Sequence, residues 1–396
     1  MQKNHFVERA EQIIEPLLTD LAAVVNIDSG TFTKAGVDEV GLYLQKRFHD
    51  FGFATYFDAQ EQYGNNLVAT REGAHASGPR LLLIGHIDTV FSAGEAVRRP
   101  YSEHEQAGLR IAKGPGVLDM KSGVLMGMYA LRLLQDESQA NYQRVTFLCN
   151  TDEEIGSLAS KALICKLAPE VDAVLVLEPG RLLNAVVSAR KGIGHYRVEV
   201  QGLSSHAGVE PHKGRNAILE LAHQVVELQA INGKIPGATL SVGVIHGGKR
   251  TNVVPDFAYC EIDVRVTSEA GLHAIEEEMH KVVAHTIVDG TVVTLSGGMR
   301  SMPFELTERS MRLLQLAREA GSELGLAIED TRSGGASDAN TAAALGLPTL
   351  DGLGAAGGLA HNPDEYIELD SLPTRIALLT NLLQRICVYY QEGNKL

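Results

Sequence analysis

Short, uninterrupted apolar segments alternate with helical patterns in the first half of this chain, and this alternation restricts the possible folds more than any other feature. Apolar residues at helical spacing separate the segments, as in residues 122–134 and 157–167. Continuous apolar strands that alternate with helices are typical of a mostly parallel sheet covered by helices on both faces. We therefore predict an α/β fold with buried strands at residues 66–70, 80–86, 145–149 and 173–177.

The middle of the chain departs from this pattern. Its apolar residues indicate the order strand, helix, strand, strand, helix, strand, which is that of a ferredoxin-like module. The expected elements are residues 195–201, 217–229, 240–246, 258–266, 269–285 and 292–296. Helical patterns then return at residues 310–324 and 372–390. We predict a first domain formed by residues 1–187 and 301–396, interrupted by an inserted α+β domain at residues 188–300.

The length and charge of the chain limit what it can bind. Its 396 residues are enough for two cores, and 35 Lys and Arg against 49 Asp and Glu give a net charge of −14. An acidic surface argues against nucleic acid and anionic membranes as partners. No apolar run approaches the roughly 20 residues of a membrane span, and the N-terminus shows no signal-peptide pattern.

The cysteines indicate a reducing compartment. None of them has the C-x-x-C spacing, and all lie in apolar runs, which is typical of buried free thiols. They are Cys149, Cys165, Cys260 and Cys387. We predict a cytoplasmic protein.

Side chains that can bind metal follow three of the predicted strands. His86 and Asp88 are two residues apart at a strand end, so both point to the same face. Glu154 ends a run of three acids after the strand at 145–149, and Glu178 follows the strand at 173–177. Each feature alone has an ordinary explanation, such as a structural hydrogen bond or a solvated loop. However, open α/β sheets bind ligands at the carboxyl ends of their strands, and cations would relieve the repulsion between the acids.

Two further candidates lie in glycine-rich loops. Asp119 follows a glycine turn just before a predicted helix, where an N-cap is the simpler explanation for it alone. His361 lies in the loop at 357–362. Two histidines and three carboxylates, with one carboxylate shared, make a complete ligand set for two divalent ions. We predict two zinc ions per chain, although cobalt or manganese would accept the same ligands.

The candidate residues occur in motifs that resemble those of the M20 family of metallopeptidases. The motifs are His-x-Asp at 86–88, Gly-x-Leu-Asp-Met-Lys at 116–121, Asp-Glu-Glu-x-Gly at 152–156, Glu178, Gly-x-Ser-Ser-His-Ala-Gly at 202–208 and His361. The resemblance covers residues 65–385 and is strongest to the glutamate carboxypeptidase branch. Acetylornithine deacetylases and succinyl-diaminopimelate desuccinylases are related to that branch.

The resemblance implies a role for each metal-binding candidate. His86 and Glu178 would hold one zinc, Glu154 and His361 would hold the other, and Asp119 would bridge them. It also implies that Asp88 orients His86 and that Glu153 is the general base.

The inserted domain would be the lid and dimerisation domain of the family. His206 of this domain would donate a hydrogen bond to the developing oxyanion, often across a homodimer. The alternative for His206 is a loop histidine satisfied by neighbouring hydroxyl groups.

Three residues of the inserted domain are candidates for substrate binding. A free carboxylate is best matched by the two parallel hydrogen bonds of an arginine. Arg300, in a glycine-bounded turn, is our first choice, and Arg265 and Asn252 follow it. Most surface arginines contact only solvent or a nearby acid, so their presence alone does not establish a binding site.

Together these features predict a two-zinc hydrolase that cuts an amide or peptide bond next to a free carboxylate. Its substrate would be a small peptide or an N-acyl amino acid, and the first choice is a carboxypeptidase that releases a C-terminal residue such as glutamate. An N-acyl-amino-acid deacylase or a dipeptidase would use the same metal ligands. A metal-binding protein without activity is disfavoured, because all five ligands, Asp88 and Glu153 are present.

Overall fold

The structure is a computed structural model, and it describes residues 4–396. Contacts between Cα atoms divide the chain into two compact units. Unit 1 consists of residues 4–188, Leu306–Arg332 and Ser337–Leu396, and unit 2 consists of Ala189–Glu305 and Ser333–Ala336. Unit 2 is therefore an insertion into the sequence of unit 1.

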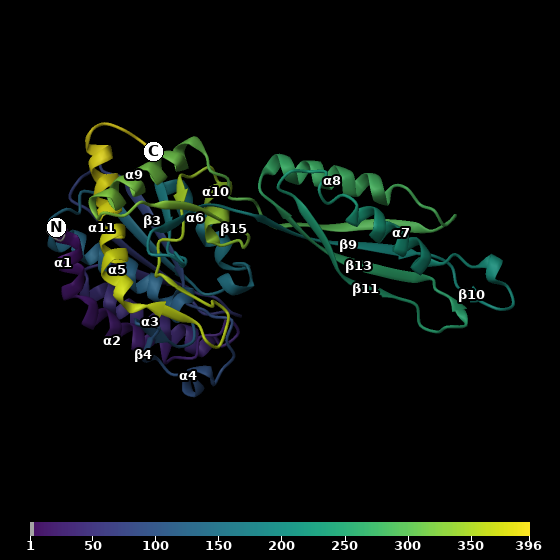
Figure 1. Cartoon of the computed structure of the whole chain (residues 1–396), viewed down its shortest axis with the longest axis horizontal. Coiled ribbons are helices and arrows are strands. Elements are labelled where there is room, and N and C mark those ends of the chain that lie inside the picture. The colour runs from purple at the N-terminus through teal and green to yellow at the C-terminus, as the bar shows by residue number, and fades with distance from the viewer. Residues whose placement is uncertain (1–3) are drawn as a thin grey trace. The chain divides into compact units, whose positions relative to one another are not determined.

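Unit 1 is built around a six-stranded sheet with the order β1-β2-β6-β3-β7-β16 (Figure 1). Strands β6, β3, β7 and β16 are parallel, whereas β1 and β2 are antiparallel. The strands are β1 (Ala54–Asp58), β2 (Asn66–Glu72), β3 (Arg80–His86), β6 (Arg144–Asn150), β7 (Ala173–Val176) and β16 (Thr349–Leu350). The side chains of β3, β6 and β7 are buried almost throughout, so their sequences are continuous apolar runs rather than alternating ones.

Helices pack around this sheet, and α5 is the most enclosed of them because it contacts α11, α2 and β3. Buried residues occur on every side of α5, as expected for a helix in the interior. The helices of unit 1 are α1 (His5–Gln12), α2 (Ile14–Val25), α3 (Lys34–Asp50), α4 (Glu95–Arg98), α5 (Ser122–Asp136), α6 (Ser160–Leu167), α9 (Glu308–Glu323), α10 (Asp338–Ala344) and α11 (Leu372–Gln391). No helix among residues 4–396 is both long enough and apolar enough to cross a membrane.

Two glycines allow α5 to lie directly against the end of β7. A Cβ atom on Gly123 would lie 2.1 Å from the carbonyl oxygen of Leu177, and one on Gly127 would lie 2.6 Å from the Leu177 side chain. Side chains at these positions would push the helix away from the sheet. The close approach brings the loop that precedes α5 next to the chain that follows β7.

A second, four-stranded sheet with the order β17-β18-β5-β4 connects distant parts of unit 1. Its strands are β4 (Ser102–Gln106), β5 (Leu109–Lys113), β17 (Gly357–Gly358) and β18 (Tyr366–Glu368). Tyr366 of β18 pairs with Lys113 of β5. The loop between β17 and β18 therefore lies close to the turn that follows β5. The remaining pair, β8 (Ala185–Arg190) and β15 (Glu329–Ser333), includes residues at the boundary between the units.

Unit 2 contains an antiparallel sheet with the order β11-β13-β9-β14, and helices α7 and α8 lie on one face of it (Figure 1). Along the chain the elements are β9 (Gly192–Gln201), α7 (Ala217–Gln229), β11 (Thr239–Gly247), β13 (Phe257–Val266), α8 (Glu269–Val283) and β14 (Val292–Ser301). Alternate side chains of β9 and β13 are buried, as expected for a sheet with helices on one face. A short pair, β10 (Ser205–His206) and β12 (Val253–Val254), extends this unit.

The predicted fold class, an α/β domain with an inserted ferredoxin-like module, is confirmed by this arrangement. Some boundaries differ from the prediction for local reasons. The helix expected from residue 157 begins at Ser160, because the carboxylate of Asp152 accepts hydrogen bonds from the backbone N–H groups of Ala159 and Ser160. The strand expected at 292–296 continues to Ser301 with a bulge after Met299.

Candidate metal centre

The metal-binding candidates of unit 1 meet at one edge of the central sheet because three parallel strands end there. His86 is the last residue of β3 and lies opposite Asn150, the last residue of β6. The backbone N–H of Leu177, just after β7, donates to the carbonyl oxygen of Ile84 at 2.9 Å. The acid run after β6 and Glu178 after β7 therefore leave the sheet beside His86.

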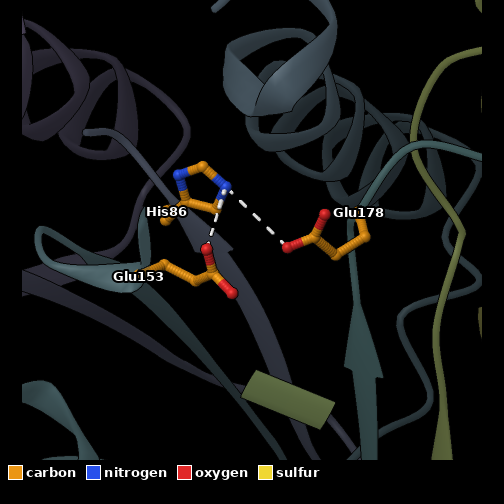
Figure 2. Close-up of side chains that lie close together, drawn as sticks. All are labelled: His86, Glu153 and Glu178. Atoms are coloured by element: carbon orange, nitrogen blue, oxygen red, sulfur yellow. Dashed lines mark ion pairs between the residues drawn. The ribbon is translucent and has the colours of Figure 1, made fainter. Parts of the chain in front are cut away.

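His86 is the centre of the first group of side chains. Its Nε2 atom lies 3.0 Å from Asp119 Oδ1, 3.8 Å from Glu178 Oε1 and 3.9 Å from Glu153 Oε2. Figure 2 shows the two glutamates directed toward this imidazole. The His86 ring is almost completely buried. One imidazole nitrogen thus faces three carboxylates in a confined space.

The second group shares Asp119 with the first. His361 Nε2 lies 3.2 Å from Asp119 Oδ2 and 3.1 Å from Glu154 Oε2. The two oxygens of Asp119 therefore face two different imidazoles, one on each side. A carboxylate in this position can bridge two cations, with one histidine and one further acid on each side as ligands.

Asp88 connects the histidine strand to the acid turn. Its Oδ1 lies 3.4 Å from His86 Nδ1, and its carboxylate accepts the backbone N–H groups of Glu153 and Glu154, each at 3.3 Å. The hydroxyl of Thr31 donates to the same carboxylate at 2.6 Å. His86 Nδ1 also lies 3.0 Å from the backbone carbonyl oxygen of Asp88. Asp88 therefore fixes the orientation of the His86 ring through its main chain as well as through its carboxylate.

The pKa values in the centre reflect an excess of buried acid. Burial raises the pKa of Glu153 well above its usual value, and the negative charge of Glu178 adds to the effect. Burial acts to raise the pKa of Asp119, but hydrogen bonds to His361 and His86 outweigh burial and lower it. Hydrogen bonds to Asp119 and Glu154 raise the pKa of His361 to about 10. Divalent cations would relieve this crowding of carboxylates.

These residues have the chemistry of a metal site. The ligand atoms of His86, Glu153 and Glu178 lie within 4.8 Å of one another, and so do those of His86, Asp119 and Glu154. His361 belongs to neither group, so its place in the centre rests on its contacts with Asp119 and Glu154. In addition, Glu154 Oε1 is buried without a hydrogen-bond partner among the described residues, which leaves it available as a ligand. Glu153 belongs to one of the groups. Glu153 lies about as close to His86 as Glu178 does. Its position therefore suits a metal ligand as well as a general base.

Glu365 was not considered in the sequence analysis, although it holds the loop that carries Asp119. Its carboxylate is buried and accepts the backbone N–H groups of Gly116, Leu118 and Asp119, at 3.2, 2.7 and 2.8 Å. Glu365 follows His361 by four residues, in the same β17–β18 loop. This one loop therefore both supplies His361 and holds the backbone of Asp119.

We expect Glu365→Ala to weaken zinc binding by roughly 10- to 100-fold, because residues that orient metal ligands have effects of this size. Glu365→Gln should be affected less, since an amide oxygen can still accept from the loop. Zinc affinity is measured by competition with a chromophoric chelator. Asp364→Ala is the matched control, because the Asp364 side chain is 70% exposed and pairs only with Lys113 in the described structure. Equal affinities in Glu365→Ala and the parent would contradict this role.

The other candidates, His206, Asn252, Arg265 and Arg300, belong to unit 2. Two of them are neighbours, because the backbone N–H of Ala207 donates to the carbonyl oxygen of Asn252 at 3.0 Å. His206 is exposed, and its Nδ1 accepts the backbone N–H groups of Gly208 and Val209, both at 3.1 Å. This leaves Nε2 of His206 as the nitrogen able to donate to a substrate.

Arg265 and Arg300 lie at the opposite end of the unit 2 sheet. Arg265 pairs with Ile193 at the start of β9, and β14 reaches the same end at Arg300. At the other end of the sheet, near the β10–β12 pair, the backbone N–H of Gly202 donates to the backbone carbonyl oxygen of Asp256. The nine residues from Asp256 to Arg265 correspond to roughly 30 Å of strand. One copy of unit 2 therefore cannot bring both pairs of candidates to one small substrate.

Comparisons with known proteins agree on one family. The model of peptidase family M20/M25/M40 matches residues 82–385. Carboxypeptidase G2 of Pseudomonas sp. (strain RS-16) is 30% identical over 380 residues, which cover 93% of this chain and 88% of that protein. A succinyl-diaminopimelate desuccinylase of Stenotrophomonas maltophilia (strain K279a) is 26% identical over 343 residues, covering 82% and 88%.

Solved structures share the fold. Aminopeptidase PepT from Bacillus cereus ATCC 10987 has a TM-score of 0.79 at 22% identity, and the match covers 94% of this chain and 98% of that one. The Bacillus subtilis YXEP protein, described as a dinuclear metal-binding peptidase from the M20 family, has a TM-score of 0.72 at 15% identity, covering 96% and 99%. At these identities the likeness concerns the fold alone.

Proposed function

Because the chain belongs to peptidase family M20/M25/M40, we propose that it is a two-zinc hydrolase that cuts an amide or peptide bond next to a free carboxylate. That the chain is a metallopeptidase or amidohydrolase follows from the family itself. The proposed number of metals rests on one observation, namely that Asp119 presents one oxygen to His86 and the other to His361. Zinc is our first choice for this set of two histidines and three carboxylates, which cobalt or manganese would also accept. Glu178 and Glu154 complete the two sides.

The residues of this chain would share the work of the reaction as follows. Two zinc ions would polarise the scissile carbonyl and make the attacking water more acidic. Glu153 would accept a proton from that water and return it to the leaving amine, from a turn held in place by Asp88. His206 would donate from Nε2 to the oxyanion that develops on the carbonyl oxygen.

We further propose that the protein works as a homodimer. A small substrate can contact both an arginine at one end of the unit 2 sheet and a histidine at the other only if two copies of unit 2 contribute. His206 of the partner subunit would then serve the site whose arginines come from the first subunit. Closed two-fold dimers are the commonest form of soluble oligomer.

Our first choice of reaction is release of a C-terminal amino acid such as glutamate. The similarity to carboxypeptidase G2 supports it, since that relative matches at higher identity and over more of this chain than the desuccinylase does. The second candidate is an N-acyl-amino-acid deacylase or a dipeptidase, which the desuccinylase similarity favours. Both reactions leave a free carboxylate beside the cut bond.

Turnover of a defined substrate panel tests the proposal. Zinc-loaded protein is assayed with N-acyl amino acids, dipeptides and peptides ending in glutamate, and release of free amine is measured. We expect the highest kcat/KM with a C-terminal-glutamate substrate. A higher value for a dipeptide or a simple N-acyl amino acid would favour the second candidate. No hydrolysis of any member by protein with verified zinc would refute the proposed function.

Glu153 and Glu154 are adjacent but should behave differently. Glu153→Gln should retain metal and reduce kcat by roughly 10²- to 10⁴-fold, because a positioned general base contributes about that much. Glu154→Gln should instead lower the zinc content, since the amide is a poor ligand beside His361. Metal analysis and kcat are measured on both variants. The same metal content in the two would show that our roles for this pair are wrong.

His206→Ala should lower kcat by roughly 10²- to 10³-fold, the usual effect of losing one oxyanion donor, and should leave metal content unchanged. His273→Ala is the control, since that histidine lies on α8 and is 71% exposed. A normal kcat in His206→Ala would show that His206 has only a structural role.

Mixed dimers test whether His206 acts across the dimer. Subunits with Glu153→Gln and subunits with His206→Ala are each inactive, but a mixed dimer contains one site with an intact Glu153 and an intact His206 of the partner subunit. Random mixing should recover about a quarter of the parent activity. If a mixture that is shown to contain mixed dimers recovers no activity, then Glu153 and His206 of the same subunit form each site.

A further inference from the structure

A cavity of about 520 Å³ lies within unit 1, between helix α9 and the segment that follows α11. The two helices pack against each other (Figure 1). The cavity is lined by side chains of α9 between Glu308 and Arg318, by Tyr389 of α11 and by residues 395–396. None of these residues belongs to the candidate metal centre. The volume suits a small organic ligand.

The walls of this cavity are held together by hydrogen bonds. The guanidinium of Arg309 donates to the carbonyl oxygen of Leu396 at 2.8 Å and to that of Gly346 at 3.2 Å. The backbone N–H of Leu396 donates to the Tyr390 hydroxyl at 3.2 Å, and the Leu396 side chain is buried. The segment after α11 is therefore anchored to both helices, which keeps the neighbouring Lys395 at the edge of a preformed cavity.

The cavity is cationic, although the chain as a whole has a net charge of −14. Its wall contains three exposed cations besides Arg309, namely Arg312, Arg318 and Lys395. In residues 4–396 no carboxylate oxygen lies within 4.0 Å of any of the three charged groups. The one acid of the wall, Glu308, lies one helical turn before Arg312 and offsets one of these charges. A positive excess of about two charges thus remains for a ligand.

This excess matches a phosphate monoester. Such a group carries a charge of about −1.5 to −2 at pH 7 and has three strong acceptor oxygens. A guanidinium binds phosphate through two parallel hydrogen bonds. Because Arg312, Arg318 and Lys395 line the same cavity, one phosphate group there would be attracted by more than one of them.

The same cavity also offers a surface for an aromatic group. The Tyr389 ring is half-buried, and the Arg312 guanidinium lies 5.8 Å from its centroid. Met311, the neighbour of Arg312 in the wall, is 52% exposed. Tyrosine and methionine side chains both make favourable contacts with aromatic rings. Apolar and cationic groups are therefore side by side in one wall.

We propose that this cavity, the anion pocket, binds a small phosphate monoester that carries an aromatic group, which is the chemistry of a nucleoside monophosphate. Arg312 and Arg318 would hold the phosphate, with Lys395 adding positive charge. Tyr389 and Met311 would contact the aromatic group. The anion pocket shares no residue with the metal centre, so this inference does not depend on the proposed function.

The test is calorimetric titration of the zinc-loaded protein with adenosine monophosphate, adenosine and inorganic phosphate. We expect adenosine monophosphate to bind at least about tenfold more tightly than either of the others, because only it contacts both parts of the wall. Arg312→Ala and Arg318→Ala should each weaken its binding by roughly 10- to 100-fold, the effect of losing a hydrogen bond to a charged group. Arg110→Ala is the control, since that arginine of β5 is 57% exposed and pairs with Glu103.

A phosphate can also bind to zinc, and the variants separate the two places. Binding at the metal centre would be the same in the parent, Arg312→Ala and Arg318→Ala, and this result would overturn the anion pocket. Tyr389→Leu should weaken adenosine monophosphate and leave inorganic phosphate unchanged. Equal affinities of the parent for these two ligands, or no binding of adenosine monophosphate, would also overturn the inference. None of these results would affect the proposed function.

Discussion

Removal of the bound metal should reduce hydrolysis to the background rate, and added zinc should restore it. Without cations, the Asp119 carboxylate contacts the two imidazoles, and the substrate carbonyl loses its main polarising groups. The carboxylates and imidazoles of the centre cannot supply the double positive charge of a metal ion, and His206 would supply only a single hydrogen bond. Activity is measured after exhaustive chelation, with metal content verified, and again after stepwise addition of zinc.

The stepwise addition also tests the number of metals. We expect activity to continue rising until two equivalents of zinc are bound per chain, because Asp119 is placed between two ligand sets. Circular dichroism of the metal-free protein serves as the control that the fold survives. Full activity in verified metal-free protein would refute metal catalysis, and a plateau at one equivalent would refute the two-metal centre.

The central strands could be predicted from the sequence because their burial leaves a strong local signal. The predicted strand at 80–86 coincides with β3. The strand predicted at 145–149 is one residue shorter than β6 at each end, and the one at 173–177 is one residue longer than β7 at its C-terminal end. All three are buried on both faces, so their apolar runs are unbroken. Since parallel strands end at one edge, the order of motifs also predicted that His86, Glu154 and Glu178 would meet.

The sheet formed by β4, β5, β17 and β18 was not predicted. Strand β4 contains Glu103, His104 and Glu105, which are exposed, so it lacks apolar alternation. Its neighbour β5 pairs on its other side with β18, across about 250 residues of sequence, as in Tyr366 with Lys113. Pairings between such distant residues leave no local pattern to recognise.

Glu365 was missed for a related reason. Its partners are backbone N–H groups, which every residue except proline has. No side-chain motif in the sequence can therefore indicate these contacts. In the sequence it is one acid of an ordinary polar loop. By contrast, a partner for Arg265 could have been found, because Asp263 is two residues away on the same strand and therefore on the same face.

The contact between Arg265 and Asp263 affects which residue can recognise the substrate carboxylate. The guanidinium of Arg265 makes a two-fold hydrogen bond to Asp263, with distances of 2.8 and 3.1 Å. A carboxylate already occupies the fork that would otherwise match the substrate. Arg300 lies at the same end of the sheet, where β14 bulges after Met299. Arg265 can pair with a substrate only by giving up its contact with Asp263, and it stays the second candidate after Arg300.

A substrate with a free carboxylate should be hydrolysed several orders of magnitude faster than the same compound with a C-terminal amide. Zinc ions polarise many amides alike, so selectivity must come from a separate group. A site built for a charged group leaves its own charge buried and unpaired when the ligand lacks that charge, and discrimination of roughly 10⁴-fold follows. The measurement is kcat/KM for the acid and the amide. Equal values in the parent would refute carboxylate recognition.

The variants then show which arginine is responsible. In Arg300→Ala the gap between acid and amide should shrink mainly because the acid becomes slower, while the amide, which never paired with the guanidinium, changes little. Arg300→Lys should recover only part of the gap, since an ammonium keeps the charge but not the two parallel hydrogen bonds. Arg265→Ala is the matched comparison at the same end of the sheet. If the gap persists in Arg300→Ala and shrinks in Arg265→Ala, then Asp263 must release Arg265 when substrate binds, and Arg265 is the carboxylate partner.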